Sequence, residues 1–576
     1  MAQEHSVLHI VVDDLRPELG AYGLRRHSPN IDRMSSQGVS FDRAYAQQAV
    51  CGPSRNSFMS GRRPDASRSW NFINHFREDH PEWTSLPGLF KAAGRPAVGV
   101  GKLYHPQLPP GYDGARSWSD AALPYHNPCW NTADNTSAPA TGEAKDGDGG
   151  LPCVPCPIDV RHYAFHDTNV TVANEWCEVD AFEDALTIRL AVAHLRRLAK
   201  GAQSFYLGVG LHKPHMPWQA APEDFAAVDA VLGPSGPSLA RRQTPPDGAP
   251  GLAMHLTEKQ LHADPYHPVG ASASRAARRA YYAAVAGMDR KLGTLLDELE
   301  AQRLSAATAV VLHADHGWHL GELGGWRKFT NFEAATRVPL IVRAPWLTRR
   351  RGLAHAARVA EVVELVDVLP TVAALAGLPL PAGESFDGRS LLPLLGSLDE
   401  LDGAAAVEER AAVGSSTELP PPLPPLPPLP PLPPLPPLPP LPPPPPPRAA
   451  FSQYPRRVHN ANAPWDNSII HEPRASFTHM GFSVRTAEWR YTEWRRWNGS
   501  ALRAIWCDDD AHGTGCGRGD ADNVYVELYD HRACNTTYPT DFDSPCEDAN
   551  VAGLAEHAAV VRELSARLRH QFDRPT

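Results

Sequence analysis

Short runs of apolar, mostly β-branched residues recur along the N-terminal part of the chain and end abruptly at polar side chains. The first run, Val7–Val12, stops at Asp13 and Asp14, which is typical of a buried parallel strand with carboxylates at its C-terminal edge. Similar runs lie at residues 97–100, 205–209, 309–312 and 338–342. The pattern predicts a sheet of buried strands.

Between these runs the apolar residues take up helical spacing. They mark one helix face between Phe182 and Leu195 and another between Tyr281 and Leu299. Strands that alternate with helices predict an α/β fold, in which ligands bind at the carboxyl ends of the strands. In this chain the strand ends are followed by Asp, Lys, His and Asp-His. No purely structural role requires these residues at these positions.

A proline-rich stretch interrupts the chain. Pro420 to Pro447 contains 21 prolines and 7 leucines, mostly as a Pro-Pro-Leu repeat. Because proline has no backbone N–H and a fixed φ angle, the stretch favours extended polyproline II. We interpret it as a semi-rigid surface insertion. A weaker alternative is a docking ligand for a proline-recognition module, for which the repeat has no flanking specificity signal.

C-terminal to the prolines, the pattern is that of a smaller α+β unit. Alternation in 480–494 predicts antiparallel strands, Val524–Tyr529 a further short strand, and Val551–Phe572 an amphipathic terminal helix. The sequence thus predicts an N-terminal α/β domain, a proline-rich insertion or linker and a C-terminal subdomain, at residues 1–400, 401–450 and 451–576.

Composition and charge exclude two classes of protein. With 42% hydrophobic and 21% charged residues among 576, the chain is an ordinary soluble globular protein. A net charge of −10 argues against general nucleic-acid binding, but it leaves room for a local basic pocket for an anionic substrate. There is no apolar run of about 18 residues, so we predict no membrane span.

Nine cysteines and four N-glycosylation sequons favour the secretory pathway. Nine is odd, so one thiol is left over if the others pair. Residues 1–5 hold no apolar stretch of signal-peptide length. We therefore expect a lysosomal or extracellular protein whose leader is missing, with a truncated or a cytosolic chain as the alternatives. The sequons begin at Asn135, Asn169, Asn498 and Asn535.

The most specific local signal is Cys51-Gly52-Pro53-Ser54-Arg55, followed by Ser60-Gly61-Arg62. A cysteine before such a turn is most often simply a buried thiol. The whole run, however, resembles the signature of the sulfatase family, in which this cysteine is oxidised to formylglycine. Met59-Ser60 stands where the family commonly has Leu-Thr.

The resemblance extends over nearly the whole chain and is greatest to the iduronate-2-sulfatase branch of that family. It implies an alkaline-phosphatase-like sulfatase fold, with a large central mixed sheet flanked by helices and a smaller C-terminal α+β domain with an antiparallel sheet. The chain departs from the branch at Leu323, which replaces histidine in Gly-Glu-His-Gly, in the proline run and in its cysteine framework. The similar segments are 13–17, 28–32, 46–51, 101–106, 212–217, 315–318, 326–328, 452–455 and 527–530.

Three aspartates at strand ends predict a metal site. Asp13, Asp14 and Asp315 offer hard oxygen ligands that suit one Ca²⁺ per chain, or Mg²⁺ if the site is tighter. The resemblance adds His316 and Cys51 to these ligands, and it implies that a formylglycine-generating maturation enzyme converts Cys51 to formylglycine (3-oxoalanine).

Hydrolysis of a sulfate ester needs a nucleophile, neutralisation of negative charge and protonation of the leaving group. The resemblance implies that the hydrated aldehyde of residue 51 attacks sulfur, that His215 protonates the departing alcohol, and that His105 accepts the proton when sulfate is expelled. It implies cationic contacts to the sulfate and the diol from Arg55, Lys102 and Lys328.

Each of these residues also has a structural explanation when taken alone. An Asp-Asp pair is more often a solvated turn, a single lysine a surface charge, and a histidine near proline a turn cap. Their joint occurrence at successive strand ends favours a site. Trp70, Trp318 and Trp326 can form an aromatic wall for a sugar ring, although core packing is expected for at least two of them. The expected substrate contacts are Lys102, His215, Trp318 and Lys328.

We therefore expect a sulfuric ester hydrolase acting on a sulfated saccharide, above all on 2-O-sulfated iduronate-type residues of glycosaminoglycan-like polysaccharides. A uronate carboxylate needs a further cation, for which Lys213, Arg456 and Arg457 are candidates. The alternatives are another sulfated polysaccharide, aryl or choline sulfate, a phosphonate or phosphate monoester, and a non-catalytic proline-rich scaffold. The expected disulfides are Cys507–Cys516, Cys534–Cys546 and Cys156 with Cys129 or Cys153, although spacing alone does not fix them.

Overall fold

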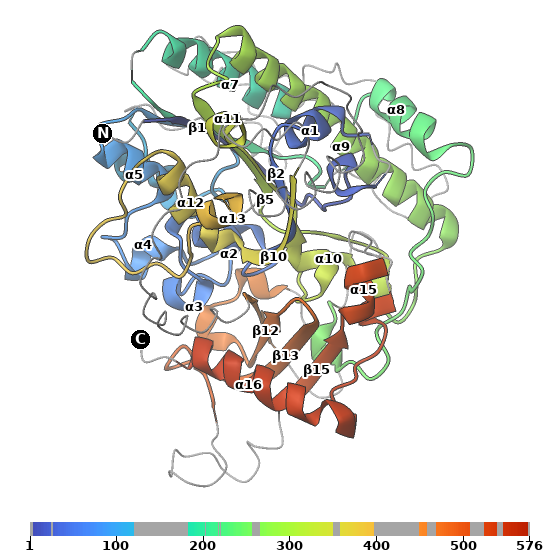
Figure 1. Ribbon diagram of the computed structural model, residues 1–576. Coiled ribbons are helices and arrows are strands. Elements are labelled where there is room, and N and C mark those ends of the chain that lie inside the picture. Colours follow the sequence, from blue (N-terminus) through green and yellow to red (C-terminus); the bar gives the residue numbers. More distant parts are fainter. Residues whose placement is uncertain are drawn as a thin grey trace, which may run out of the picture.

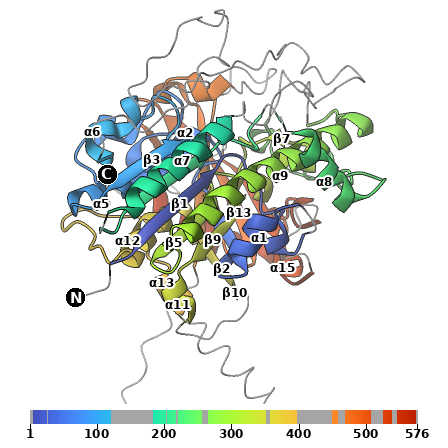
Figure 2. The ribbon, with the colours of Figure 1, turned by 90° about the horizontal axis from the view of Figure 1, so that it is seen from above.

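An eight-stranded mixed sheet forms the centre of the molecule (Figures 1 and 2). Its order is β10-β2-β9-β5-β1-β4-β3, and β8 pairs with β2. The strands are β1 (Ser6–Val12), β2 (Val39–Tyr45), β3 (Ala97–Gly101), β4 (Tyr206–Leu211), β5 (Thr308–Ala314), β8 (Arg337–Val338), β9 (Leu340–Arg343) and β10 (Ala357–Glu364). The computed structural model describes residues 4–24, 27–119, 183–201, 203–216, 218, 220–255, 265–349, 357–396, 448–457, 468–506, 524–537 and 545–573.

Four neighbouring parallel strands bring their carboxyl ends to one edge of this sheet. In the register, Val12 of β1 lies opposite Leu211 of β4 and Ala314 of β5, and Gly101 of β3 lies opposite Gly210 of β4. All four strands are buried along their whole length. Because the strands end level with one another, the polar residues that follow them are brought together, as the sequence predicts.

The pattern predicts one parallel strand at residues 338–342, and this prediction is wrong. Pro339 has no N–H to donate, and it divides the run into β8 and β9. Both segments run antiparallel to β2, and β9 also pairs antiparallel with β5. The sequence analysis did not predict β2 or β10. The centre of β2 is formed by the half-buried polar residues Asp42 and Arg43, so this strand has no continuous apolar run.

Helices cover both faces of the sheet (Figures 1 and 2). The helices α7 (Glu183–Ala199) and α9 (Ala271–Ala301), both predicted from helical spacing, lie on one face with α1 (Pro29–Ser35) and α8 (Pro222–Leu232). On the other face lie α2 (Cys51–Ser60), α5 (Leu86–Ala92) and α12 (Val368–Leu375). The shorter helices are α3 (Pro64–Ser67), α4 (Phe76–Asp79), α6 (Gly114–Ser117), α10 (Glu333–Thr336), α11 (Pro345–Arg349), α13 (Leu392–Gly396) and α15 (Arg532–Thr537).

A second, antiparallel sheet forms the C-terminal part of the molecule. Its order is β11-β12-β13-β14, and β15 pairs with β13. The predicted antiparallel pair in 480–494 is β12 and β13, and the expected fold class is confirmed. These strands are β11 (Ala450–Arg456), β12 (His479–Arg485), β13 (Trp489–Asn498), β14 (Arg503–Ala504) and β15 (Tyr525–Asp530).

The terminal helix begins later than the sequence predicts. It is α16 (Ala558–Phe572) and packs against β12 and β13. The backbone N–H of Val551 instead donates to Leu528 O at 2.9 Å, so the segment before α16 continues along β15. The predicted helix start at Val551 is therefore wrong.

The apolar residues form two main cores. The larger core fills both faces of the central sheet, between Val7 and Leu395. The second core lies under the C-terminal sheet and includes Val50, Trp70, Phe329 and Phe332 from the large domain. The C-terminal sheet therefore shares its core with segments that adjoin Cys51 and Lys328. A smaller third cluster joins Tyr45, Val362 and Ala450.

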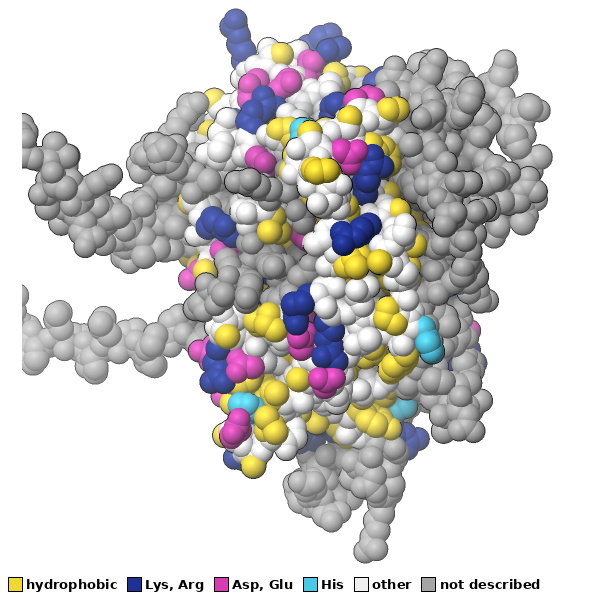
Figure 3. Space-filling view, turned by 90° about the vertical axis from the view of Figure 1, so that its right-hand side faces the viewer, with side chains coloured by type: hydrophobic (Ala, Val, Ile, Leu, Met, Phe, Trp, Pro, Cys, Tyr) yellow, Lys and Arg dark blue, Asp and Glu magenta, His cyan; other side chains and the backbone are white. Residues whose placement is uncertain are grey.

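Several sequence predictions lie outside the described residues. They include the proline run at 420–447, the sequons at Asn135 and Asn169, and six cysteines. None of the described helices is long and apolar enough to cross a membrane. On the face shown in Figure 3, acidic and basic side chains are interspersed rather than gathered by sign.

Candidate active site

Asp13 and Asp14 follow β1 directly, and their side chains have different partners: Asp13 pairs with Lys102, and Asp14 with Lys328. Asp14 has a positive φ of 59°, a left-handed conformation that aspartate tolerates better than most residues. The Tyr281 hydroxyl on α9 holds this turn, because it donates to Asp14 O at 2.8 Å and accepts from Arg16 N at 3.0 Å. The sequence analysis missed this role, because the helical spacing identifies Tyr281 only as one residue on the apolar face of a helix.

Cys51 is the first residue of α2 and is completely buried. Pro53 fits this first turn, where its missing N–H is not needed, and Gly61 ends the helix in a left-handed conformation. Cys51 thus lies at the positive end of the helix dipole, where negative charge is favoured.

Arg55, one turn further along α2, joins three strand ends. Its guanidinium lies 3.2 Å from Asp13 and 3.0 Å from Asp315, and it also donates to the backbone oxygen of Lys102. The end of β3 is pressed tightly against β4, since a Cβ on Gly210 would lie 2.1 Å from the carbonyl carbon of Lys102. The glycine thus allows Lys102 to enter the site.

Two lysines flank Cys51. Lys102 Nζ pairs with Asp13 and lies 3.9 Å from Cys51 Sγ, while Lys328 Nζ lies 2.7 Å from Asp14 Oδ1 and 3.0 Å from Cys51 Sγ. Lys328 stands between Arg327 and Phe329, which both have a φ of 75°. Two such residues on either side of Lys328 cost about 1–3 kcal/mol each, which points to a functional reason for this backbone.

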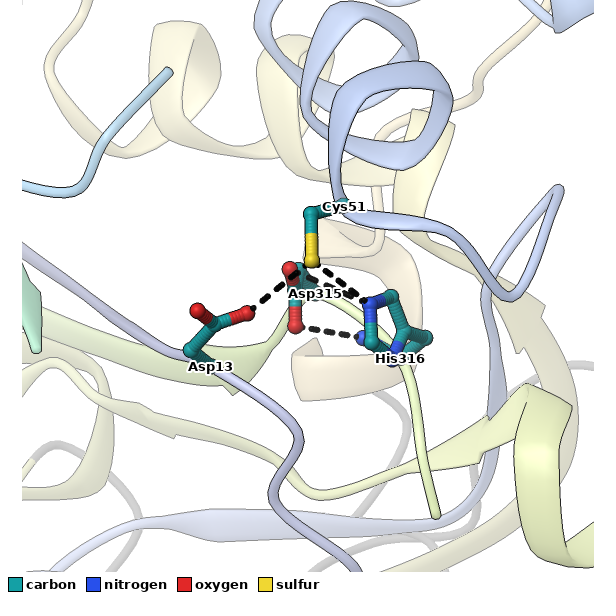
Figure 4. Close-up of side chains that lie close together, drawn as sticks. All are labelled: Asp13, Cys51, Asp315 and His316. Carbon is teal, nitrogen blue, oxygen red and sulfur yellow. Dashed lines mark hydrogen bonds and ion pairs between the residues drawn. The ribbon is translucent and has the colours of Figure 1, made fainter. Parts of the chain in front are cut away.

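Asp315 and His316 follow β5 and face the same centre (Figure 4). His316 Nδ1 lies 3.0 Å from Gly317 O, and since a carbonyl only accepts, Nδ1 carries the proton. The lone pair of neutral His316 is then on Nε2, which lies 3.3 Å from Cys51 Sγ. The ring is thus oriented as a metal ligand requires.

The donor set fits a divalent metal. One ligand atom from each of Asp13, Cys51, Asp315 and His316 lies within 4.8 Å of the others, and Figure 4 shows the four side chains converging. Oδ2 of Asp14 is buried and has no hydrogen-bond partner among the described residues, so it offers a further acceptor for a cation. Carboxylate oxygens are the ligands that Ca²⁺ and Mg²⁺ prefer.

The three carboxylates differ in their pKa values. Burial would raise the pKa of Asp13, but Lys102 and Arg55 outweigh it and hold the pKa well below its ordinary value. Burial raises the pKa of Asp14 to about 6, although Lys328 opposes the shift, and that of Asp315 to about 7, although Arg55 opposes it. The neighbouring cations thus do not fully offset the cost of burying the negative charges of Asp14 and Asp315. This is typical of a site that takes up a further positive charge.

The charges around Cys51 also affect its thiol and Lys328. Burial, with Asp13 adding to it, raises the pKa of the Cys51 thiol, so the unmodified side chain is a poor nucleophile. Burial would lower the pKa of Lys328, but Asp14 raises it above its ordinary value. Lys328 therefore keeps its positive charge in the buried site.

The structure also brings the two predicted proton-transfer histidines to this region. His215 Nδ1 lies 2.6 Å from Met216 O, so its other nitrogen, Nε2, faces Asp14 Oδ2 at 4.0 Å. The His215 side chain is 26% exposed and is thus reachable from outside. His105 stacks on Phe72 with ring centroids 4.0 Å apart, and burial, followed by Lys102, lowers its pKa well below the ordinary value.

Two residues singled out for substrate contact pack against the protein itself: Trp318, an expected contact, and Arg456, one of three candidates for a uronate carboxylate. Trp318 is only 1% exposed and packs edge to face against Trp218, and Lys328 Nζ lies over its ring at 5.5 Å. Arg456 is buried, and its guanidinium donates to the backbone oxygens of Leu252, Met254 and Phe329. Trp70 and Trp326 are buried as well.

The cysteines follow the prediction where the structure describes them. Cys534 and Cys546 form a disulfide with their Cα atoms 6.0 Å apart, which confirms that pair. Cys51 is free and buried. The other predicted pairs lie outside the described residues.

The chain is similar to known proteins of one family. Residues 5–378 match the family model described as Sulfatase. Iduronate 2-sulfatase from Mus musculus is 32% identical over 542 residues, and that from Homo sapiens is 32% identical over 541; each match covers 87% of this chain and 87% of the relative. Phosphonate monoester hydrolase from Silicibacter pomeroyi shares the fold, with a TM-score of 0.62 and 19% identity over 99% of this chain and 95% of that one. The chain therefore belongs to the sulfatase family, whose members are sulfuric ester hydrolases.

Proposed function

We propose that this protein removes the 2-O-sulfate from iduronate-type residues of a sulfated saccharide, and that Cys51 acts as formylglycine after conversion by a maturation enzyme. The observation that carries the proposal is the 32% identity to two iduronate 2-sulfatases, which covers 87% of each chain. The position of Cys51 among three carboxylates and three cations supports it.

The cofactors of the proposal are a divalent metal, Ca²⁺ or Mg²⁺, and formylglycine at residue 51. When bound, the metal supplies positive charge at the sulfate oxygens, and formylglycine supplies a hydroxyl nucleophile. The residues that would hold the metal are Asp13, Asp14, Cys51, Asp315 and His316.

The buried cations of the chain neutralise the sulfate. Lys102 and Lys328 approach Cys51 Sγ within 3.9 and 3.0 Å, so both reach a sulfate group bound at residue 51. Arg55 sets the two carboxylates Asp13 and Asp315 in position. Because these groups are buried and already ordered, they stabilise the developing charge without reorganising, and each contact accounts for a factor of about 10² to 10³ in rate.

His215 protonates the leaving alcohol in this proposal. Its Nδ1 proton is held by Met216 O, so the proton that moves is on Nε2, the atom next to Asp14. Burial, and then Lys102, lowers the pKa of His215 well below its ordinary value, and an anionic sulfate ester would raise it again. His105, near Lys102, accepts the second proton.

The carboxylate of a uronic acid needs a cation that is not used by the sulfate. The Arg456 guanidinium already donates to three backbone oxygens, so we do not assign it this role. Lys213 in the His215 turn and Arg457, whose side chain is 31% exposed beside Glu472, are the remaining candidates. Replacing each by Met should raise KM for a uronate substrate and leave KM for an aryl sulfate unchanged.

The test is a panel of defined substrates offered to protein produced with the maturation enzyme. We expect sulfate release from saccharides with a 2-O-sulfated iduronate at the non-reducing end, none when that end is blocked, and none from Cys51→Ala. Preference for internal sulfates, for choline sulfate or for aryl sulfates would contradict the substrate. Faster turnover of aryl phosphate or phosphonate than of every sulfate would support the alternative reaction.

A further inference from the structure

A buried carboxylate on α7 holds the turn that carries His215. Asp184, in the first turn of α7, is 2% exposed and accepts two backbone hydrogen bonds. His212 N donates to its Oδ1 at 2.6 Å, and Lys213 N donates to its Oδ2 at 2.9 Å. The carboxylate thereby ties the helix to the residues that directly follow β4.

These two amides lie just beyond the last sheet hydrogen bonds at the end of β4. On one side Lys102 N donates to Gly210 O, and on the other Asp13 N donates to Leu211 O. A buried N–H without an acceptor is costly, and a charged carboxylate gives stronger hydrogen bonds than a neutral oxygen. Asp184 thus completes the hydrogen bonding at the point where the chain leaves the sheet for the active site.

The anchored turn ends at His215. His215 N donates to His212 O at 2.9 Å, and the two imidazoles stack with centroids 4.7 Å apart. His212 is itself buried against the cluster, since one ligand atom each of Asp13, His212 and His215 lies within 4.8 Å of the others. The direction of His215 Nε2 therefore depends on the turn that Asp184 fixes.

We propose that Asp184 is a positioning residue: through the amides of His212 and Lys213 it fixes the turn so that Nε2 of His215 faces the oxygen that leaves with the alcohol. This inference rests on the proposed function, in which His215 protonates that oxygen. Nothing in the local sequence around Asp184 marks it, because a single carboxylate near a helix start is common.

Such a role makes a specific prediction about leaving groups. Proton donation accelerates a reaction by about 10² to 10⁴, and it matters most where the departing oxygen is strongly basic. An acidic phenol leaves without help. Loosening the turn should therefore slow the substrates with poor leaving groups and spare those with good ones, whereas general damage to the fold would slow all of them equally.

The experiment compares wild type, Asp184→Asn, His215→Gln and the double variant on aryl sulfates of increasing phenol pKa, with formylglycine occupancy measured for each protein. We expect kcat of Asp184→Asn to fall about 10²-fold for the least acidic phenol and less than about threefold for 4-nitrophenyl sulfate, with KM nearly constant. In the His215→Gln background the Asp184 change should add nothing. The control is Asp229→Asn, whose carboxylate pairs with Arg279 and is 45% exposed.

Equal losses for all leaving groups, or a full further loss in the double variant, would overturn the inference. If Asp184→Asn does not fold, Asp184→Glu, which keeps both acceptor oxygens on a longer side chain, carries the same comparison. A wild-type protein that has formylglycine but cleaves no sulfate ester overturns the proposed function instead, so the two failures are distinguishable.

Discussion

The Nζ atom of Lys328 lies 3.0 Å from the Sγ atom of Cys51. The same Nζ binds Asp14 at 2.7 Å, so one buried cation connects the nucleophile position with a carboxylate of the metal site. The Lys328 side chain is buried, so these two partners hold its ammonium group in place. Lys328 is therefore the residue where loss of charge should be most informative.

Replacing Lys328 by Met should reduce kcat on any sulfate ester by about 10² to 10³, because the sulfate loses one preorganised positive charge. The measurement is steady-state kinetics with formylglycine occupancy determined for both proteins. Lys200→Met, at an exposed position, serves as the control. Unchanged kcat for Lys328→Met would remove this lysine from the mechanism.

Replacing Asp14 by Asn should lower both the metal content and the activity, the latter by at least about 10²-fold, since the neutral amide is a weaker ligand for a hard cation. Elemental analysis and turnover before and after chelation test this. The control is Asp42→Asn, which weakens the pair of Asp42 with Arg358 and should keep its metal. Full turnover in excess chelator, with no metal retained, is the contradictory result.

The fold and the site differ in how far the sequence predicts them. The buried parallel strands are predicted from their continuous apolar runs. The polar residues that follow these runs, Asp13, Lys102, His212 and Asp315, are predicted to lie together. By contrast, β2 has polar residues at its centre, so the pattern of apolar residues does not predict it. Asp184 and Tyr281 act through backbone atoms of distant segments, and no local pattern reveals contacts between residues so far apart in the chain.

Trp318 and Arg456 show a second limit. Both residue types are common in saccharide and anion sites; Trp318 lies in a segment that resembles the family, and Arg456 directly follows one. The structure buries them, because Trp318 fills the core below Lys328 and Arg456 satisfies three backbone oxygens. Residue type and chain position alone do not distinguish a ligand contact from such support.

Replacing Arg456 by Lys should therefore reduce stability rather than substrate binding. Lysine cannot reach three separate backbone oxygens, and each unpaired buried oxygen costs about 1–3 kcal/mol. We expect a lower melting temperature with KM nearly unchanged, measured by thermal unfolding and kinetics. Its neighbour provides the control, since Arg457→Lys should melt as wild type does. A raised KM at constant stability would restore Arg456 as a substrate contact.

Glu322 gives a prediction of pH dependence. Burial would raise its pKa, but Arg16 and Arg278 lower it to about 2. Because the folded pKa lies below the unfolded value of about 4.3, the ionised carboxylate stabilises the fold above that value, and the contribution is lost as the pH falls toward about 2. Glu322→Gln should melt at a lower temperature near pH 7, and the difference from wild type should shrink between about pH 4.3 and 2.

Thermal unfolding at several pH values tests this, with Asp297→Asn as the control because that carboxylate is 65% exposed in its pair with Arg33. A difference between Glu322→Gln and wild type that is the same at all pH values would show that the charge of Glu322 is not what stabilises the fold.

The measurement that tests the central claim most directly is the mass of the peptide spanning residues 44–55 from protein that turns over a sulfate ester. The account predicts that residue 51 carries an aldehyde in place of the thiol, and that the specific activity of different preparations rises in proportion to this form. Fully active protein in which residue 51 is an unmodified cysteine would contradict it.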